Sequence, residues 1–214
     1  MIDDLFGSEP QLERLQIEDA DIRFARQIAL PEPLDQLLST LINKTPWRSE
    51  SVTVWGKTFQ QPRLVAWYGD DGQRYSYSGI SLDPLPWTQT LLGVRDTVQA
   101  LTGEQFNSVL LNYYRDHRDS MGFHSDDERE LGPTPTIASL SLGATRTFVL
   151  KHKQRHDLKP VRIDLPSGSL LIMKGKTQQH WKHGIDKQAK PCGARVNLTF
   201  RQIAQHDHVR LPSP

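Results

Sequence analysis

The sequence predicts a mainly β protein with flanking helices, of the α+β class. Strand-like segments follow one another closely from residue 105 onward, turn residues separate them, and no long helix interrupts them. Closely spaced strands of this kind are typical of a sandwich, barrel or jelly roll. The predicted strands of this half span 106–114, 136–143, 146–153, 161–166, 168–175, 180–185 and 194–203.

Two predicted helices precede this β half. Residues 31–44 place apolar side chains at helical spacing after a proline-rich start, which suits a first helical turn. Residues 87–101 repeat the pattern, and we expect that helix to end near Gly103. The apolar positions are Leu34, Leu37, Leu38, Leu41 and Ile42 in the first helix, and Leu91, Leu92, Val94, Val98 and Leu101 in the second.

Strand-like sequence also lies between the two helices. The segment 51–57, SVTVWGK, carries β-branched residues up to a Trp-Gly turn. The segment 64–79, LVAWYGDDGQRYSYSG, is typical of a β-hairpin around Asp71-Gly72. Residues 1–20 are polar and acidic, and we expect them to form a loosely held extension.

The composition limits the class of protein. A length of 214 residues suits one domain with an extension. The mean hydropathy is −0.56, and no apolar run approaches the ~18 residues of a transmembrane helix, so we expect no membrane span. The start, MIDDLFGSEP, is acidic where a secretory signal is basic and then apolar. A single cysteine, Cys192, excludes a disulfide framework, so we expect a cytoplasmic protein.

The net charge of +1 conceals an asymmetry along the chain. Residues 1–50 carry 5 Lys and Arg against 10 Asp and Glu, whereas residues 51–214 carry 21 against 15. The basic body is compatible with a polyanionic partner, and equally with ordinary solvated charge.

A candidate metal site begins with His124-Ser125-Asp126. Residues two apart on a strand project to one face, so this imidazole and this carboxylate can approach one cation. His183, on another predicted strand, completes the His/Asp/His set of non-haem Fe(II) oxygenases. His180 is the rival third ligand, because two residues three apart on a strand face opposite ways and only one can line the site. We interpret the other histidines as surface residues: 117, 152, 156, 206 and 208.

The strand at 195–201, RVNLTFR, separates its side chains cleanly by period 2. Val196, Leu198 and Phe200 share an apolar face, which indicates contact with a core. The opposite face carries Arg195, Asn197, Thr199 and Arg201, a suitable floor for a dicarboxylate because arginine binds carboxylates bidentately. The two arginines lie ~20 Å apart, so they serve different ends of a ligand, or one of them orients the metal ligands.

These segments, in this order, resemble a known family. The run NYY, HSDDERELGPTPTIASLSLGATRTFVL, GSLLIMKGKTQQHWKHGI and RVNLTFR is similar to the AlkB family of Fe(II)- and 2-oxoglutarate-dependent nucleic-acid dealkylases. This resemblance covers about residues 106–203. The preceding VWGK, YGDDGQRYSYSG and PW segments are similar to the nucleotide-recognition lid of the branch that acts on duplex DNA.

The resemblance implies one structural domain in three parts. Residues 106–205 would form a double-stranded β-helix (jelly-roll) core, which is the Fe(II)/2-oxoglutarate dioxygenase unit. Residues 46–105 would form the nucleotide-recognition lid and a helix. Residues 1–45 would form an N-terminal extension and the first helix.

The resemblance also implies the residues of the active site. Fe(II) would be bound by His124, Asp126 and His183. The contacts of 2-oxoglutarate would be Asn112, Tyr114, Arg195, Asn197, Thr199 and Arg201.

The implied substrate contacts come mostly from the lid. Tyr75 and Tyr77 would stack on an extruded base, opposite the His124 ring, and Asp127 would accept a hydrogen bond from the exocyclic amine of the base. A finger of Val54, Trp55 and Gly56 would fill the gap left by that base, with Trp55 and Tyr77 where phenylalanine is usual in relatives. Lys151, Lys153 and Arg155 lie in a basic segment that suits phosphate contact, and Arg63 is a further candidate.

The implied activity is oxidative demethylation of bases such as 1-methyladenine and 3-methylcytosine in DNA. Fe(II) is the cofactor, 2-oxoglutarate and O₂ are co-substrates, and formaldehyde, succinate and CO₂ are released. We expect a monomer that binds methylated DNA. The alternatives are an oxygenase acting on RNA or on a substrate that is not a nucleic acid, a binding module without catalysis, and a cupin-like protein.

Overall fold

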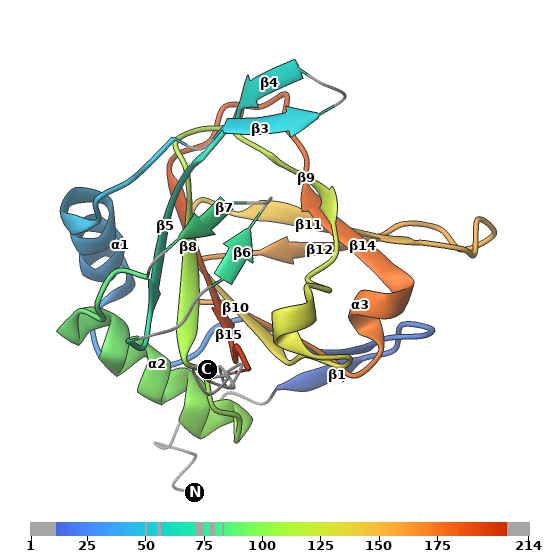
Figure 1. The fold of residues 1–214 in the computed structure, drawn as a ribbon, viewed down its shortest axis with the longest axis horizontal. Helices are drawn as coiled ribbons and strands as arrows, with labels where there is room; N and C mark the ends of the chain where they lie inside the picture. The colour runs from blue at the N-terminus through green and yellow to red at the C-terminus, as the bar shows by residue number, and fades with distance from the viewer. Residues whose placement is uncertain are drawn as a thin grey trace, which may run out of the picture.

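The computed structural model describes residues 12–49, 51–54, 57–71, 75–77, 80–82 and 84–204. Within them, two antiparallel sheets dominate, as the sequence predicts (Figure 1). The larger sheet has the strand order β1-β2-β13-β10-β15-β8-β5, and the smaller has the order β12-β11-β14-β9. The strands of the larger sheet are β1 (Glu13–Leu15), β2 (Asp21–Ala25), β5 (Leu64–Gly69), β8 (Ser108–Tyr114), β10 (Ile137–Gly143), β13 (Leu170–Lys174) and β15 (Arg195–Arg201), and those of the smaller are β9 (Met121–His124), β11 (Arg146–His152), β12 (Val161–Leu165) and β14 (Trp181–Ile185).

Two helices cover the outer face of the larger sheet. They are α1 (Leu34–Lys44) and α2 (Gln89–Thr102), and Figure 1 shows both on the same side of β5 and β8. Leu37, Leu41, Leu91 and Val98 are buried there with apolar residues of the sheet. The predicted end of the second helix is confirmed, because the chain turns at Gly103 with a φ of 71°, where glycine has no steric penalty. None of the described helices is long and apolar enough to cross a membrane.

A second apolar cluster fills the space between the two sheets. It joins Leu110 and Leu171 of the larger sheet to Phe148, Leu150 and Ile185 of the smaller one. The two sheets pack face to face around this core, and the helices lie outside them.

The N-terminal strands were not predicted. Residues 1–20 were expected to be a loosely held extension, but β1 lies at 13–15 and β2 follows at 21–25. β2 pairs with β13, and Ile22 is fully buried in the core between the sheets. Strands of three and five residues are too short for a period-2 pattern to stand out from the surrounding sequence.

The predicted hairpin at 64–79 is wrong. β5 pairs with β8 of the larger sheet, and the strand after Asp71, β6 (Tyr75–Tyr77), pairs with β7 (Ile80–Leu82). Val65 to Gly69 are buried on both faces of β5, so this strand gains more by lying inside a large sheet than in an isolated hairpin. A separate hairpin of β3 (Ser51–Val54) and β4 (Lys57–Gln60) agrees with the strand predicted at 51–57.

The last strand is buried on both faces. Val196, Leu198 and Phe200 lie in the core beneath α1 and α2, as their spacing predicts. The polar face is buried as well, so it faces the interior of the protein and not solvent. His180 is not on a strand at all, because it ends the short helix α3 (Thr177–His180) and β14 begins at Trp181.

Candidate active site

The predicted metal ligands meet between two neighbouring strands. His124 ends β9 and is the cross-strand partner of His183 in β14, with ring centroids 4.4 Å apart. The carboxylate of Asp126 lies against both rings, with Oδ1 3.8 Å from His124 Nε2 and Oδ2 3.7 Å from His183 Nε2. The three ligand atoms therefore surround one small volume, from one side of which further ligands could enter.

The protonation states in this cluster suit a metal. Burial lowers the pKa of His183 to about 3, so its imidazole is neutral at ordinary pH. The Nδ1 of His124 lies 2.9 Å from the carbonyl oxygen of Gly122, which leaves Nε2 as the free ligand atom when Nδ1 holds the proton. Burial raises the pKa of Asp126, but Arg201, His183 and His124 together outweigh burial and hold that pKa well below its usual value. Two imidazoles and one carboxylate, without a thiolate, are a donor set for Fe(II).

The polar face of β15 lines the same cavity as the three ligands. Five of the six predicted co-substrate contacts lie around it, namely Tyr114, Arg195, Asn197, Thr199 and Arg201. The sixth, Asn112, is not among the lining residues, although it is the cross-strand partner of Asn197. The two arginines occupy different places, since Arg201 donates from Nη2 to Asp126 Oδ1 at 2.7 Å.

Arg195 is a buried cation with unmade hydrogen bonds. It is 1% exposed, its guanidinium lies over the Tyr114 ring at 5.0 Å, and Nη2 donates to Ser141 Oγ at 2.8 Å. Its Nε and Nη1 have no hydrogen-bond partner within the part of the chain that the structure describes. A buried donor without an acceptor is costly, and a carboxylate would satisfy two of these groups at once. This observation fits the far carboxylate of 2-oxoglutarate.

The comparisons with known proteins agree with this site. Residues 21–201 match the family model described as the 2OG-Fe(II) oxygenase superfamily. The chain belongs to this superfamily.

Curated relatives of this oxygenase confirm the resemblance to the AlkB family. The chain is 47% identical to human DNA oxidative demethylase ALKBH2, with 71% of the chain and 60% of the relative covered. It is 42% identical to the alpha-ketoglutarate-dependent dioxygenase alkB homolog 3 of Rattus norvegicus, over 79% of the chain and 59% of the relative. The Arabidopsis thaliana ALKBH2 is 36% identical, over 74% and 58%. The chain thus spans about 60% of the length of these relatives.

A solved structure supports the fold. The structure of OsALKBH1 superimposes with a TM-score of 0.57 at 18% identity, and covers 85% of this chain and 96% of that one. At 18% identity, this likeness shows the fold and nothing further about the site.

Arg63 does not lie where the predicted phosphate contact requires. The residue is 4% exposed, and its Nε donates to Asn112 Oδ1 at 2.7 Å. A DNA phosphate binds at the surface, where this buried guanidinium does not lie. Arg63 instead holds Asn112, the cross-strand partner of the cavity residue Asn197. Sequence position alone gave no information on its burial.

The other predicted phosphate contacts lie nearer the surface. Lys153 Nζ is 3.0 Å from the carboxylate of Asp127, and the exposed Arg155 forms ion pairs with Glu18 and Asp157. Lys151 is exposed and lies over the Phe123 ring at 3.7 Å.

Two further residues of this region are buried. Arg146 belongs to the same basic segment, but it is 1% exposed and donates to the carbonyl oxygens of Asp116, Asp119 and Asp186. The His152 side chain, interpreted as a surface group, is 1% exposed.

The lid residues can be located only in part. Val54 is the last residue of β3, and Tyr75 and Tyr77 are the first and last residues of β6. The side chains of these three residues lie outside what the structure describes. Trp55 and Gly56 lie outside the described residues. The predicted finger and base pocket therefore remain predictions.

The sequence reasoning missed several residues that support the site. Ser139 and Ser141, on β10, accept hydrogen bonds from Asn197 and Arg195. Their alternation with Leu140 and Leu142 in SLSLG is the same two-faced pattern that singled out β15, and it could have identified them. Gln178, which bonds the main chain of Asp126, has no such signal.

Proposed function

We propose that this oxygenase is a DNA demethylase that oxidises N-methyl groups on bases of the 1-methyladenine and 3-methylcytosine type. The observation that carries the proposal is the buried Arg195, whose unbonded guanidinium nitrogens share one cavity with the His/Asp/His cluster. Such a cavity suits a keto diacid beside Fe(II), and relatives at 42–47% identity are named for demethylation and for dioxygenase activity.

Each residue of the site has a role in this proposal. His124, Asp126 and His183 hold the metal on one side, and Arg201 keeps the Asp126 carboxylate ionised and oriented. Arg195 binds the far carboxylate of 2-oxoglutarate, with Tyr114 beside it. When bound, Fe(II) and 2-oxoglutarate together activate O₂, and 2-oxoglutarate supplies two electrons as it is oxidised to succinate and CO₂. The enclosing apolar walls, Met173 and Phe148 among them, restrict water at that point.

The lid role belongs to the two small hairpins. A methyl group on the Watson–Crick edge is hidden in a duplex, so the base must be extruded and stacked between flat side chains. The pairs β3–β4 and β6–β7 each form a two-stranded sheet of their own, separate in hydrogen bonding from the two large sheets. This separation supports their assignment to substrate recognition. In this proposal Tyr75 and Tyr77 stack on the base, and Val54, Trp55 and Gly56 fill the vacated gap. Asp127 accepts from the base, and Lys151, Lys153 and Arg155 face phosphates.

The test is formaldehyde release from methylated oligonucleotides. Purified protein with Fe(II), 2-oxoglutarate and an oligonucleotide containing 1-methyladenine or 3-methylcytosine should yield formaldehyde and the unmodified base, as detected by mass spectrometry. His183→Ala should abolish the reaction. Parallel reactions with single-stranded DNA, duplex DNA and RNA identify the preferred type of nucleic acid.

One result would refute the substrate assignment while preserving the site. If wild-type protein consumes 2-oxoglutarate but leaves every methylated oligonucleotide unchanged, and if DNA does not stimulate that consumption, the substrate is not a nucleic acid. The alternative, an oxygenase acting on another substrate class, would then replace the proposal.

A further inference from the structure

The segment that carries Asp126 has left the sheet. β9 ends at His124, whose partner is His183, so the main chain of Asp126 lies two residues beyond the last ladder position. Arg201 bonds the Asp126 carboxylate, but that contact does not fix the main chain from which the carboxylate projects. Some other group must place this backbone.

Two successive residues of the segment are bonded to the start of β14 and to α3. Ser125 Oγ donates to the carbonyl oxygen of Trp181 at 3.0 Å. The main-chain N–H of Asp126 donates to Oε1 of Gln178 at 2.9 Å, and this bond is buried. These contacts take the place of the ladder hydrogen bonds that end at β9.

The next residue is tied to the same helix through a lysine. Lys153 Nζ donates to the carbonyl oxygen of Gln178 at 2.7 Å and to Asp127 Oδ2 at 3.0 Å. Residues 125, 126 and 127 are thus each connected to residues 178–181, directly or through Lys153.

The amide of Gln178 has a fixed orientation. The residue is 2% exposed, and its Nε2 lies 3.5 Å from the sulfur of Met173, so the carbonyl end of the amide points to the Asp126 N–H. An amide oxygen accepts and its nitrogen donates, so only this orientation satisfies the Asp126 donor.

Helix α3 is itself firmly attached to the sheet. Thr177 Oγ1 accepts from the main-chain N–H of Asp21 at 2.9 Å and donates to the carbonyl oxygen of Lys174 at 2.6 Å. The first residue of α3 therefore joins β2 and β13, and the helix can act as a rigid support.

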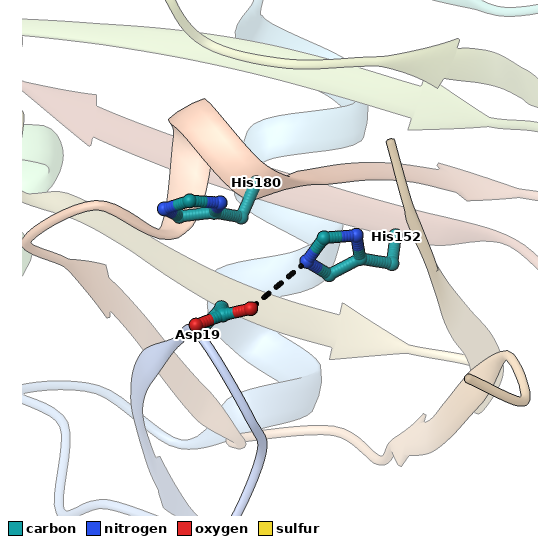
Figure 2. A group of neighbouring side chains, drawn as sticks. All are labelled: Asp19, His152 and His180. Carbon is teal, nitrogen blue, oxygen red and sulfur yellow. Dashed lines mark hydrogen bonds and ion pairs between the residues drawn. The ribbon is translucent and has the colours of Figure 1, made fainter. Parts of the chain in front are cut away.

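The other end of α3 lies in a cluster that resembles a metal site (Figure 2). Asp19, His152 and His180 offer ligand atoms within 4.8 Å of one another. However, His152 Nδ1 accepts from the main-chain N–H groups of Gln154 and Arg155, so the single proton of the neutral ring is on Nε2. That nitrogen donates to Asp19 Oδ2 at 3.3 Å and has no lone pair for a metal. The cluster thus supports α3, with the His180 and His152 rings stacked at 5.8 Å.

We infer that Gln178 is a positioning residue, which places the main chain of Asp126 so that its carboxylate meets the two imidazoles. The inference rests on the metal site of the proposed function. It assigns the alignment of one metal ligand to a side chain that contacts neither metal nor substrate.

The test substitutes Gln178 by methionine and measures metal binding alone. Methionine has a similar length and can pack against Met173, but it cannot accept from the Asp126 N–H. With Mn(II) as the probe and without substrate, the dissociation constant should rise about 10- to 100-fold. The electron paramagnetic resonance spectrum of bound Mn(II) should change as well, while the thermal midpoint of the metal-free protein should fall by only a few degrees, because the buried Asp126 N–H loses its acceptor.

The matched control is Gln179→Met on the same helix. Gln179 is exposed and donates to the carbonyl oxygen of Pro133, away from the metal ligands, so Mn(II) affinity should be unchanged. Wild-type affinity and spectrum in Gln178→Met would overturn the inference. If that variant does not fold, Gln178→Asn decides, because its shorter side chain withdraws the acceptor from the Asp126 N–H and the inference requires weaker Mn(II) binding there too. Wild-type protein that binds no Mn(II) would instead refute the proposed function.

Discussion

Arg201 and Asp126 form a buried ion pair at the candidate metal site. Arg201 Nη2 lies 2.7 Å from Asp126 Oδ1, and the two side chains are 4% and 2% exposed. The sequence left two roles open for the second arginine of β15, a ligand contact or the orientation of the metal ligands. The ion pair supports the second role, although Arg201 also lines the cavity.

Substitution of Arg201 by methionine should weaken both folding and metal binding. Removing one partner of a buried ion pair leaves the other charge uncompensated, at a cost of about 3–5 kcal/mol. Urea unfolding of the metal-free protein measures the loss of stability, and titration with Mn(II) measures affinity. An unchanged urea midpoint would show that the buried ion pair of Arg201 with Asp126 does not stabilise the fold.

Arg195→Met should separate ligand binding from stability. Two guanidinium nitrogens, Nε and Nη1, have no hydrogen-bond partner among the residues that the structure describes, so removal of the group should leave the ligand-free protein about as stable as wild type, or more stable. The dissociation constant of 2-oxoglutarate for the Mn(II)-loaded protein should rise at least about 30-fold, because truncation of a buried charged partner costs about 2–5 kcal/mol. Calorimetric titration checks this, and unchanged 2-oxoglutarate affinity would refute the assignment of Arg195.

Gly184→Ala should displace the two metal-bearing strands. A Cβ at this position would lie 2.8 Å from the carbonyl oxygen of Met121 in β9, and a backbone atom cannot easily yield. We expect a loss of about 1–3 kcal/mol in unfolding free energy, together with weaker Mn(II) binding as His124 moves from His183. Gly122→Ala, on β9, is the matched control, since its Cβ would meet nothing within 4 Å.

The stability of the protein should fall in acid partly through Asp119. Burial raises the pKa of this carboxyl group, but hydrogen bonds from the Arg115 guanidinium and main chain outweigh burial and keep the pKa below its usual value. A lowered pKa stabilises the fold above about pH 4, the value in the unfolded chain, and this contribution is lost as the pH falls through the folded pKa.

Asp119→Asn provides the measurement. The variant should lose about 1 kcal/mol at pH 7, a modest value because Arg115 is half exposed and solvent screens the pair. At pH 2 the two proteins should differ less, because wild type has then lost the same contribution. Urea midpoints at both pH values report the difference. If the gap between the midpoints of the two proteins is the same at pH 7 and pH 2, the Asp119 carboxylate does not contribute to the acid dependence of stability.

Much of the β half could be predicted from sequence, and the reason is periodicity. The strands at 137–143 and 195–201 alternate apolar and small or polar residues, the strand at 146–152 carries a central apolar run, and the structure has strands at each place. The pairing of β5 could not be predicted, because period and turn residues identify a strand but not its partner. β1 and β2 are short, and they join the larger sheet through the pairing of β2 with β13, which local sequence does not encode.

By itself, the sequence determined the chemistry available to this protein. Two imidazoles, a carboxylate and a strand with one polar face are local facts of residue type and spacing. Only the tertiary structure decided which arginine is paired and which is left with unmade bonds, that Arg63 is buried, and that α3 supports the Asp126 main chain. These facts depend on distances between residues 49 to 75 positions apart, which the packing of two sheets sets and which local propensity does not encode.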